Sequence, residues 1–211
     1  MKVFIFDFDG TITPEDTTDL ILELPGDDRI WEIEREWVTG TLTAYQCMQA
    51  QARFLQGVSV DAVRRHLRQR SHVDKAFFPL LQFLQKEGFT IVLLSEGYDL
   101  SIQFHDIPKY IREIYCSRLG VEGGRLTGDL TVWNERTWDY ADPCLGCCIC
   151  KVDFLLRLCR GHTVTTSVAV GDGGSDACLF RYVDVSFGLN PKYEATYHVK
   201  DLSDVLAVLQ N

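Results

Sequence analysis

The feature that most constrains this chain is an apolar run that ends in two carboxylates. Residues 3–6 (VFIF) are continuously apolar, which is typical of a strand buried on both faces of a sheet. Asp7 and Asp9 follow at once, within DFDGT at residues 7–11. Two carboxylates at the mouth of a buried strand repel each other and resist desolvation. Either a bound cation or a chemical task explains them, or Asp9 belongs to a turn and Asp7 caps a helix.

Two later apolar runs end in a similar way. Residues 90–94 (TIVLL) lead directly into Ser95, and residues 166–170 (TSVAV) lead almost directly to Asp172. Parallel strands joined by right-handed crossovers present their carboxyl ends at a common crevice. We therefore expect Asp7, Ser95 and Asp172 to converge on one site.

Residues of these types suit phosphoryl transfer. A carboxylate at Asp7 can attack phosphorus to form an acyl-phosphate, and Asp9 can protonate the leaving alkoxide and later activate water. A Mg²⁺ ion held by Asp7 and Asp172 would offset the repulsion between the two anions, and Lys151 would add positive charge. Backbone N–H groups can complete the cradle. The residues expected around the phosphate are Gly10, Thr11, Ser95, Glu96, Gly97 and Lys151.

Between the first two apolar runs the pattern is helical. Apolar residues recur there at three- and four-residue spacings among charges, and no strand is expected from residue 16 to 71. The pattern predicts helices over residues 16–24, 29–38, 42–55 and 59–70. We therefore predict a helical cap at residues 15–75, inserted into a core formed by residues 1–14 and 76–211.

The rest of the chain alternates strands and helices. Such alternation predicts an α/β fold with a Rossmann-like parallel sheet sandwiched by helices. The expected elements are helices at 78–86, 151–159 and 202–209, strands at 115–119 and 183–187, and a hairpin at 123–133 that turns around Thr127-Gly128.

Four motifs now resemble the haloacid dehalogenase (HAD) superfamily. They are DFDGT at residues 7–11, Ser95 after a buried run, Lys151, and the sequence GDGGSD at residues 171–176. They occur in order and span most of the chain. The helical insertion resembles the superfamily's C1-type cap, and the hairpin, with its Leu-Thr-Gly, resembles the phosphoserine phosphatase branch.

The resemblance implies a role for each matching residue. Asp7 would be the nucleophile and a Mg²⁺ ligand, and Asp9 the general acid and base with its backbone carbonyl on the metal. Asp172 would be the second side-chain ligand, whereas Asp176 would act through a water or orient Lys151. Phosphoserine phosphatases carry a substrate-sensing glutamate where this chain has the shorter Asp16.

The function implied is that of a Mg²⁺-dependent phosphomonoesterase. It would release inorganic phosphate from a small phosphorylated metabolite through an aspartyl-phosphate, as phosphoserine phosphatases do. An alternative within this function is the methionine-salvage substrate 2-hydroxy-3-keto-5-methylthiopentenyl-1-phosphate, the substrate of MtnX-like phosphatases. Two further alternatives are a phosphomutase of the same superfamily and a non-catalytic phospholigand-binding or regulatory protein. The intact set of Asp7, Asp9, Lys151 and Asp172 argues against the binding protein, which needs no nucleophile.

Four of the eight cysteines crowd in front of Lys151. A similar run occurs in MtnX-like phosphatases. Four thiolates permit a tetrahedral Zn²⁺ site, but four ligands within seven residues are tighter than the usual paired knuckles. The other reading is a reduced, partly buried loop. The cysteines concerned are Cys144, Cys147, Cys148 and Cys150.

Composition narrows the choice of partners and compartment. The formal net charge of -9 argues against nucleic acid or an anionic membrane as the main partner. No apolar run approaches the roughly 20 residues that cross a bilayer. Asp7 and Asp9 interrupt the first apolar run too early for a signal peptide. We therefore expect a cytoplasmic protein, and the sequence leaves its oligomeric state open.

Overall fold

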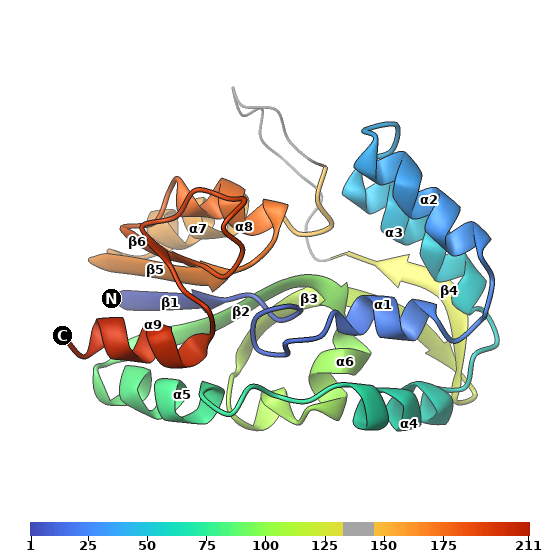
Figure 1. The fold of residues 1–211 in the computed structure, drawn as a ribbon, viewed down its shortest axis with the longest axis horizontal. Helices are drawn as coiled ribbons and strands as arrows, with labels where there is room; N and C mark the ends of the chain where they lie inside the picture. Colours follow the sequence, from blue (N-terminus) through green and yellow to red (C-terminus); the bar gives the residue numbers. More distant parts are fainter. Residues whose placement is uncertain (133–145) are drawn as a thin grey trace.

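A single mixed sheet forms the centre of the protein (Figure 1). The structure is a computed structural model that describes residues 1–132 and 146–211. The described strands lie in the order β4-β3-β2-β1-β5-β6-β7, and all neighbours are parallel except the antiparallel β3–β4 pair. The strands are β1 (Lys2–Phe6), β2 (Phe89–Tyr98), β3 (Glu113–Glu122), β4 (Arg125–Thr131), β5 (Thr166–Gly171), β6 (Val185–Gly188) and β7 (Tyr197–His198).

The first strand of the chain lies in the middle of this sheet. Phe6, its last residue, is in register with Leu93 of β2 on one side and Val170 of β5 on the other. The Asp7 backbone N–H then donates a 3.0 Å hydrogen bond to the Val170 carbonyl. The strands that follow β1 are added first on one side of it (β2, β3) and later on the other (β5, β6), and such a switch point is where open parallel sheets bind ligands.

Helices cover both faces of the sheet (Figure 1). Phe4 and Phe6 pack with α5 and α9 on one face, whereas Val3 and Ile5 pack with α7 and α8 on the other. This alternation follows from the two-residue period of a strand, and it makes both faces of β1 apolar. The helices are α5 (Phe77–Lys86), α7 (Lys151–Gly161), α8 (Gly174–Phe180) and α9 (Leu202–Leu209), and the shorter α6 (Asp99–Phe104) links β2 to β3.

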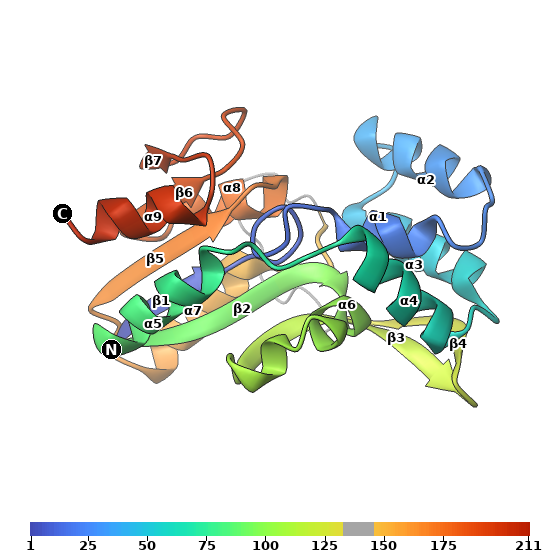
Figure 2. The same cartoon turned by 60° about the horizontal axis from the view of Figure 1, so that its bottom comes forward.

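Four helices and one 3-10 turn lie together at one end of the sheet (Figure 2). As expected, residues 16–71 contain no strand. Asp16 caps α1, and Thr43 forms a capping box with Gln46 at the start of α3. These elements are α1 (Thr17–Leu22), α2 (Arg29–Val38), α3 (Ala44–Ala52), η1 (Arg53–Leu55) and α4 (Val60–Arg70).

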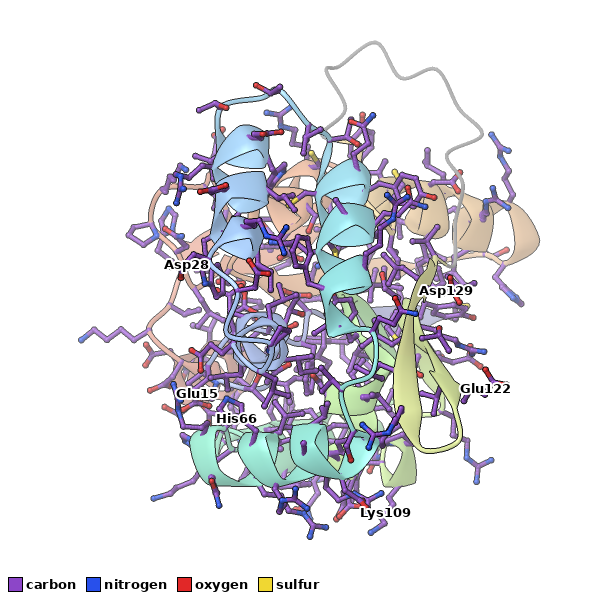
Figure 3. The ribbon with its side chains drawn as sticks, turned by 90° about the vertical axis from the view of Figure 1, so that its right-hand side faces the viewer. Glu15, Asp28, His66, Lys109, Glu122 and Asp129 are labelled. Atoms are coloured by element: carbon purple, nitrogen blue, oxygen red, sulfur yellow. The ribbon has the colours of Figure 1, made fainter. Side chains whose placement is uncertain are left out.

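The cap helices share an apolar core with the β3–β4 hairpin, which lies beside α3 in Figure 3. The Gly57 N–H donates to the Leu126 carbonyl, and the Leu126 N–H donates to the Val58 carbonyl, both at 2.8 Å. Leu126 is buried among side chains of the cap. The predicted division into core and cap stays a prediction, and the hairpin ties the two parts together.

Several predicted boundaries were wrong. The hairpin turns at Gly123-Gly124, where both φ angles are positive, whereas Gly128 lies inside β4 against the backbone of Arg53. Strand β2 continues past Leu94 to Tyr98 through a register shift. β7 was missed because it has only two residues. Strand length and turn position depend on pairing partners, which the local sequence does not specify.

Candidate active site

The ends of β1 and β5 meet at one place. The side-chain oxygens of Asp7, Asp172 and Asp176 approach within 4.8 Å of one another. Gly10, in the loop after β1, packs directly against the Asp172 side chain. A Cβ on Gly10 would lie only 2.4 Å from Asp172 Oδ2, so the loop after β1 touches the loop after β5. Its φ of 68° also suits glycine. The pairing of β1 with β5 and the contact between Gly10 and Asp172 therefore bring the first and last predicted motifs together.

Lys151 is the buried cation of the site, with a side chain 1% exposed. Its Nζ lies 2.8 Å from Asp7 Oδ1 and 2.6 Å from Asp176 Oδ1. Burial alone would lower the pKa of this amine, but the charges of Asp176 and Asp7 outweigh it and raise the pKa above its usual value. Lys151 therefore carries its charge between two carboxylates, and its predicted role as a counter-charge to the phosphate stays a prediction.

The acidic trio fits a hard divalent cation. Burial, reinforced by the charge of Asp7, raises the pKa of Asp172 to about 7 and that of Asp176 to about 8, although Lys151 opposes both shifts. A cation among these oxygens would remove that repulsion. Thr11 Oγ1 is buried nearby in the sequence motif and makes no hydrogen bond with the described residues. Carboxylate and hydroxyl oxygens are the donors that Mg²⁺ prefers.

Asp9 is held by the first turn of the cap. Its Oδ1 accepts hydrogen bonds from the Thr17 N–H at 2.8 Å and from the Thr17 hydroxyl at 2.5 Å, and its Oδ2 accepts one from the Thr18 hydroxyl at 3.3 Å. Burial raises the pKa of Asp9 well above its usual value, and the charge of Asp16 adds to the shift. The sequence reading missed both threonines. Their only signal is their position at the start of a helix that directly follows the motif.

Gly97 lies against Asp9, and the Ser95 side chain lies beside Gly97. Ser95 is 1% exposed, and its Oγ accepts a 3.0 Å hydrogen bond from the Gly97 N–H. A Cβ on Gly97 would lie 2.2 Å from Asp9 Oδ2 and 3.2 Å from Ser95 Oγ. The end of β2 therefore forms one wall of the site, and only glycine fits at its closest point.

Glu96 was expected to contact the phosphate, but its side chain is hydrogen-bonded to the protein backbone. Its Oε2 accepts a 3.1 Å hydrogen bond from the Cys148 N–H. Burial raises the pKa of this carboxyl, while Lys151 and its hydrogen-bond donors oppose the shift. An anionic carboxylate repels phosphate. The predicted contact between Glu96 and the phosphate therefore stays a prediction, and only the backbone N–H of Glu96 is suited to it.

Asp16 lies at the exposed edge of the site. It caps α1, and its Oδ1 accepts a 3.0 Å hydrogen bond from the Asp19 N–H. Its charge contributes to the raised pKa values of Asp9 and Asp172, so Asp16 lies near both carboxyls. Burial raises the pKa of the neighbouring Asp19 to about 7, with further contributions from Asp16 and Glu34. The predicted specificity role of Asp16 stays a prediction.

The described cysteines do not support a zinc site. Cys148 is buried with its Sγ 3.4 Å from Met48 Sδ, and the Cys150 Sγ accepts a hydrogen bond from the Asp153 N–H at the start of α7. Within residues 1–132 and 146–211, the only group of three metal-ligand side chains is the aspartate trio. Cys144 lies outside the described residues. These contacts agree with the reading of a reduced, partly buried loop.

The mostly parallel sheet lies between two layers of helices, and acidic residues stand at the ends of the adjacent strands β1 and β5. This arrangement is that of an α/β enzyme with its site at the carboxyl ends of the strands. The profile of the haloacid dehalogenase-like hydrolase family matches residues 4–181. The chain belongs to this family. It is therefore a hydrolase, as predicted.

Three similar proteins come from one branch of this family, the phosphoserine phosphatases. The chain is 27% identical to a phosphoserine phosphatase of Saccharomyces cerevisiae, over 99% of this chain and 67% of that protein. It is 23% identical to a phosphoserine phosphatase of Methanocaldococcus jannaschii, over 99% of this chain and 98% of that protein. A solved structure of a phospho-aspartyl intermediate analogue of phosphoserine phosphatase superposes with a TM-score of 0.74 at 21% identity, over 98% of each chain.

These similarities confirm the predicted superfamily, the α/β fold and the resemblance to phosphoserine phosphatases. They give no specific support to the methionine-salvage branch. No helix in the described part of the chain is both long and apolar enough to cross a membrane.

Proposed function

We propose that the protein is a Mg²⁺-dependent phosphomonoesterase that acts on a small phosphorylated metabolite through an aspartyl-phosphate. The observation that supports this most directly is the buried Lys151, which pairs with Asp7 and Asp176 beside Asp172. A fixed cation among several carboxylates suits a reaction in which an anionic nucleophile attacks an anionic phosphate. Asp9 stands apart from that pairing, held by the cap.

In the first step, a carboxylate oxygen of Asp7 attacks phosphorus and the bond from phosphorus to the ester oxygen breaks. The electron pair leaves with the ester oxygen, which takes a proton from Asp9. The raised pKa of Asp9 fits this role, because burial favours the protonated form of the carboxyl, which is the form that donates a proton. The product of this step is an acyl-phosphate on Asp7 and a free alcohol.

In the second step, water attacks the same phosphorus. Asp9, now a carboxylate, accepts a proton from that water, and the bond between Asp7 and phosphorus breaks to release inorganic phosphate. Lys151 stays charged throughout and orients Asp7. Ser95 lies at the end of β2, and its hydroxyl is proposed to donate to a phosphate oxygen.

Mg²⁺ fits the donor set, and Asp7, Asp172 and the Asp9 backbone carbonyl are the proposed ligands, with Asp176 acting through water or through Lys151. When bound, the ion neutralises charge on the phosphate and on the attacking carboxylate. The acidic residues that crowd the site need such a partner.

Phosphoserine is the first substrate to test, because the two similar proteins described above are phosphoserine phosphatases. Asp16 is proposed to face the part of the substrate beyond the phosphate, because it lies at the exposed edge of the site and its charge acts on Asp9. The cap at residues 15–75 is proposed to cover the bound substrate.

The mechanism is tested with Asp7→Asn and an aryl phosphate substrate in the presence of Mg²⁺. We expect no turnover above background, because the amide is a poor nucleophile, and an unchanged circular dichroism spectrum. Asp61→Asn is the matched control, since Asp61 is exposed on α4, where it pairs with the neighbouring Arg64. Wild-type turnover in Asp7→Asn would overturn the mechanism.

Product analysis separates the alternatives. Release of inorganic phosphate from phosphoserine or another monoester supports hydrolysis, whereas isomerised sugar phosphate without release supports a phosphomutase. A protein that binds phosphate esters without turning any of them over would instead be the non-catalytic binding protein.

A further inference from the structure

The buried carboxylate of Glu96 has a place in the fold that the proposed mechanism does not use. Glu96 lies between Ser95 and Gly97, which form the wall of the site next to Asp9. The Glu96 side chain is directed toward the segment before α7, where its Oε2 accepts the 3.1 Å hydrogen bond from the Cys148 N–H. A desolvated carboxylate without such donors would be costly.

Three chain segments meet at this carboxylate. The Cys147 and Ser175 side chains also lie close enough to this carboxylate to favour its charged form and so lower its pKa. Glu96 thus connects the end of β2 to the segment before α7 and to the first turn of α8. A carboxylate with several donors is satisfied, and it holds its donors at fixed positions.

Both contacted segments carry groups of the active site. Lys151 is the first residue of α7 and follows the segment that contains Cys148. Asp176 lies in the first turn of α8, directly after Ser175. Because Lys151 and Asp176 form an ion pair at 2.6 Å, a shift of either segment displaces this pair relative to Asp7.

The cap contacts the same segment from the other side. The Tyr45 N–H donates a 2.8 Å hydrogen bond to the Gly146 carbonyl, and the Cys148 Sγ lies 3.4 Å from Met48 Sδ on α3. A Cβ on Gly146 would lie 2.6 Å from Thr43. The segment before Lys151 is therefore held between α3 and Glu96.

We infer that Glu96 is a positioning residue for Lys151, which fixes the amine against Asp7 by holding the backbone that leads into α7. This inference rests on the proposed function, since it assigns Glu96 a part in the same reaction. It also explains why a carboxylate is found at a strand end where phosphate is to bind: hydrogen-bond donors stabilise the carboxylate, and the carboxylate acts by holding them in place.

A double-mutant cycle tests the inference. Glu96→Ala and Lys151→Met are made singly and together, and kcat and KM for an aryl phosphate are measured with Mg²⁺. We expect Glu96→Ala to lower kcat by about 10²-fold, since a displacement near 1 Å costs about that much. In the Lys151→Met background the same change should alter kcat by less than about twofold, because two groups that act as a unit are not additive.

Two further variants separate positioning from folding. Glu96→Gln keeps the length and one acceptor oxygen, so it should retain kcat within about tenfold of wild type. Glu122→Ala, at the exposed end of β3, is the matched control and should change neither kcat nor the melting temperature. If the turnover of Lys151→Met is too low to measure, the cycle is run on the Kd of inorganic phosphate. If Glu96→Ala does not fold, Glu96→Gln takes its place in the cycle, and its smaller effect should likewise shrink in the Lys151→Met background.

Equal effects of Glu96→Ala in the two backgrounds would overturn the inference, because they would mean that Glu96 acts independently of Lys151. So would a kcat that stays near wild type in a folded Glu96→Ala protein. Neither result touches the proposed function, which fails only if the wild-type protein hydrolyses no phosphate monoester.

Discussion

Gly97→Ala measures how closely the end of β2 approaches the proposed acid. The new Cβ would lie 2.2 Å from Asp9 Oδ2, whereas ordinary contacts begin at 3.4 Å, so Asp9 must retreat by about 1 Å. Retreat stretches the hydrogen bonds that Asp9 accepts from Thr17. A displacement of this size lowers the rate by about 10²-fold, which corresponds to about 2.7 kcal/mol in the activation free energy.

The assay compares kcat for an aryl phosphate in Gly97→Ala and Gly161→Ala. Gly161 is the matched control because a Cβ there would meet nothing within 4 Å, and neither glycine needs a left-handed backbone. We expect a loss of about 10²-fold for Gly97→Ala only, with both proteins folded by circular dichroism. Equal kcat values in the two variants would refute the proposed contact between Gly97 and Asp9, or the role of Asp9.

Two further predictions concern stability. Without metal, burial and the charge of Asp7 raise the pKa of Asp172 to about 7 and that of Asp176 to about 8, so the folded protein binds more protons than the unfolded chain above about pH 4 and loses stability as the pH rises. The melting temperature of EDTA-treated protein should therefore fall between about pH 5 and pH 8, and Mg²⁺ should raise it most at the upper end; a flat profile would contradict this. Leu126→Ala, in the apolar cluster that the cap shares with the hairpin, should lower the free energy of unfolding by about 2–5 kcal/mol in urea titrations. A loss below about 0.5 kcal/mol would contradict that packing.

Local sequence determined the central part of the site. Residues 3–6 are apolar on both faces, so they form a strand only in the middle of a sheet, and Asp7 must then lie at the strand's carboxyl end. Ser95 and Asp172 follow strands of the same kind, and parallel pairing brings all three ends together. Hydrophobic pattern and handedness of connection were sufficient here, because both act through short stretches of chain.

Contacts between distant residues were decided by the tertiary structure alone. The hydrogen bonds from Thr17 to Asp9 and from Cys148 to Glu96 join separate motifs. No periodicity or spacing indicates such pairs, since a hydrogen bond depends on position to within tenths of an ångström. The sequence by itself therefore determined which groups meet at the strand ends, because strand burial is a local property, whereas packing decided how each group is held.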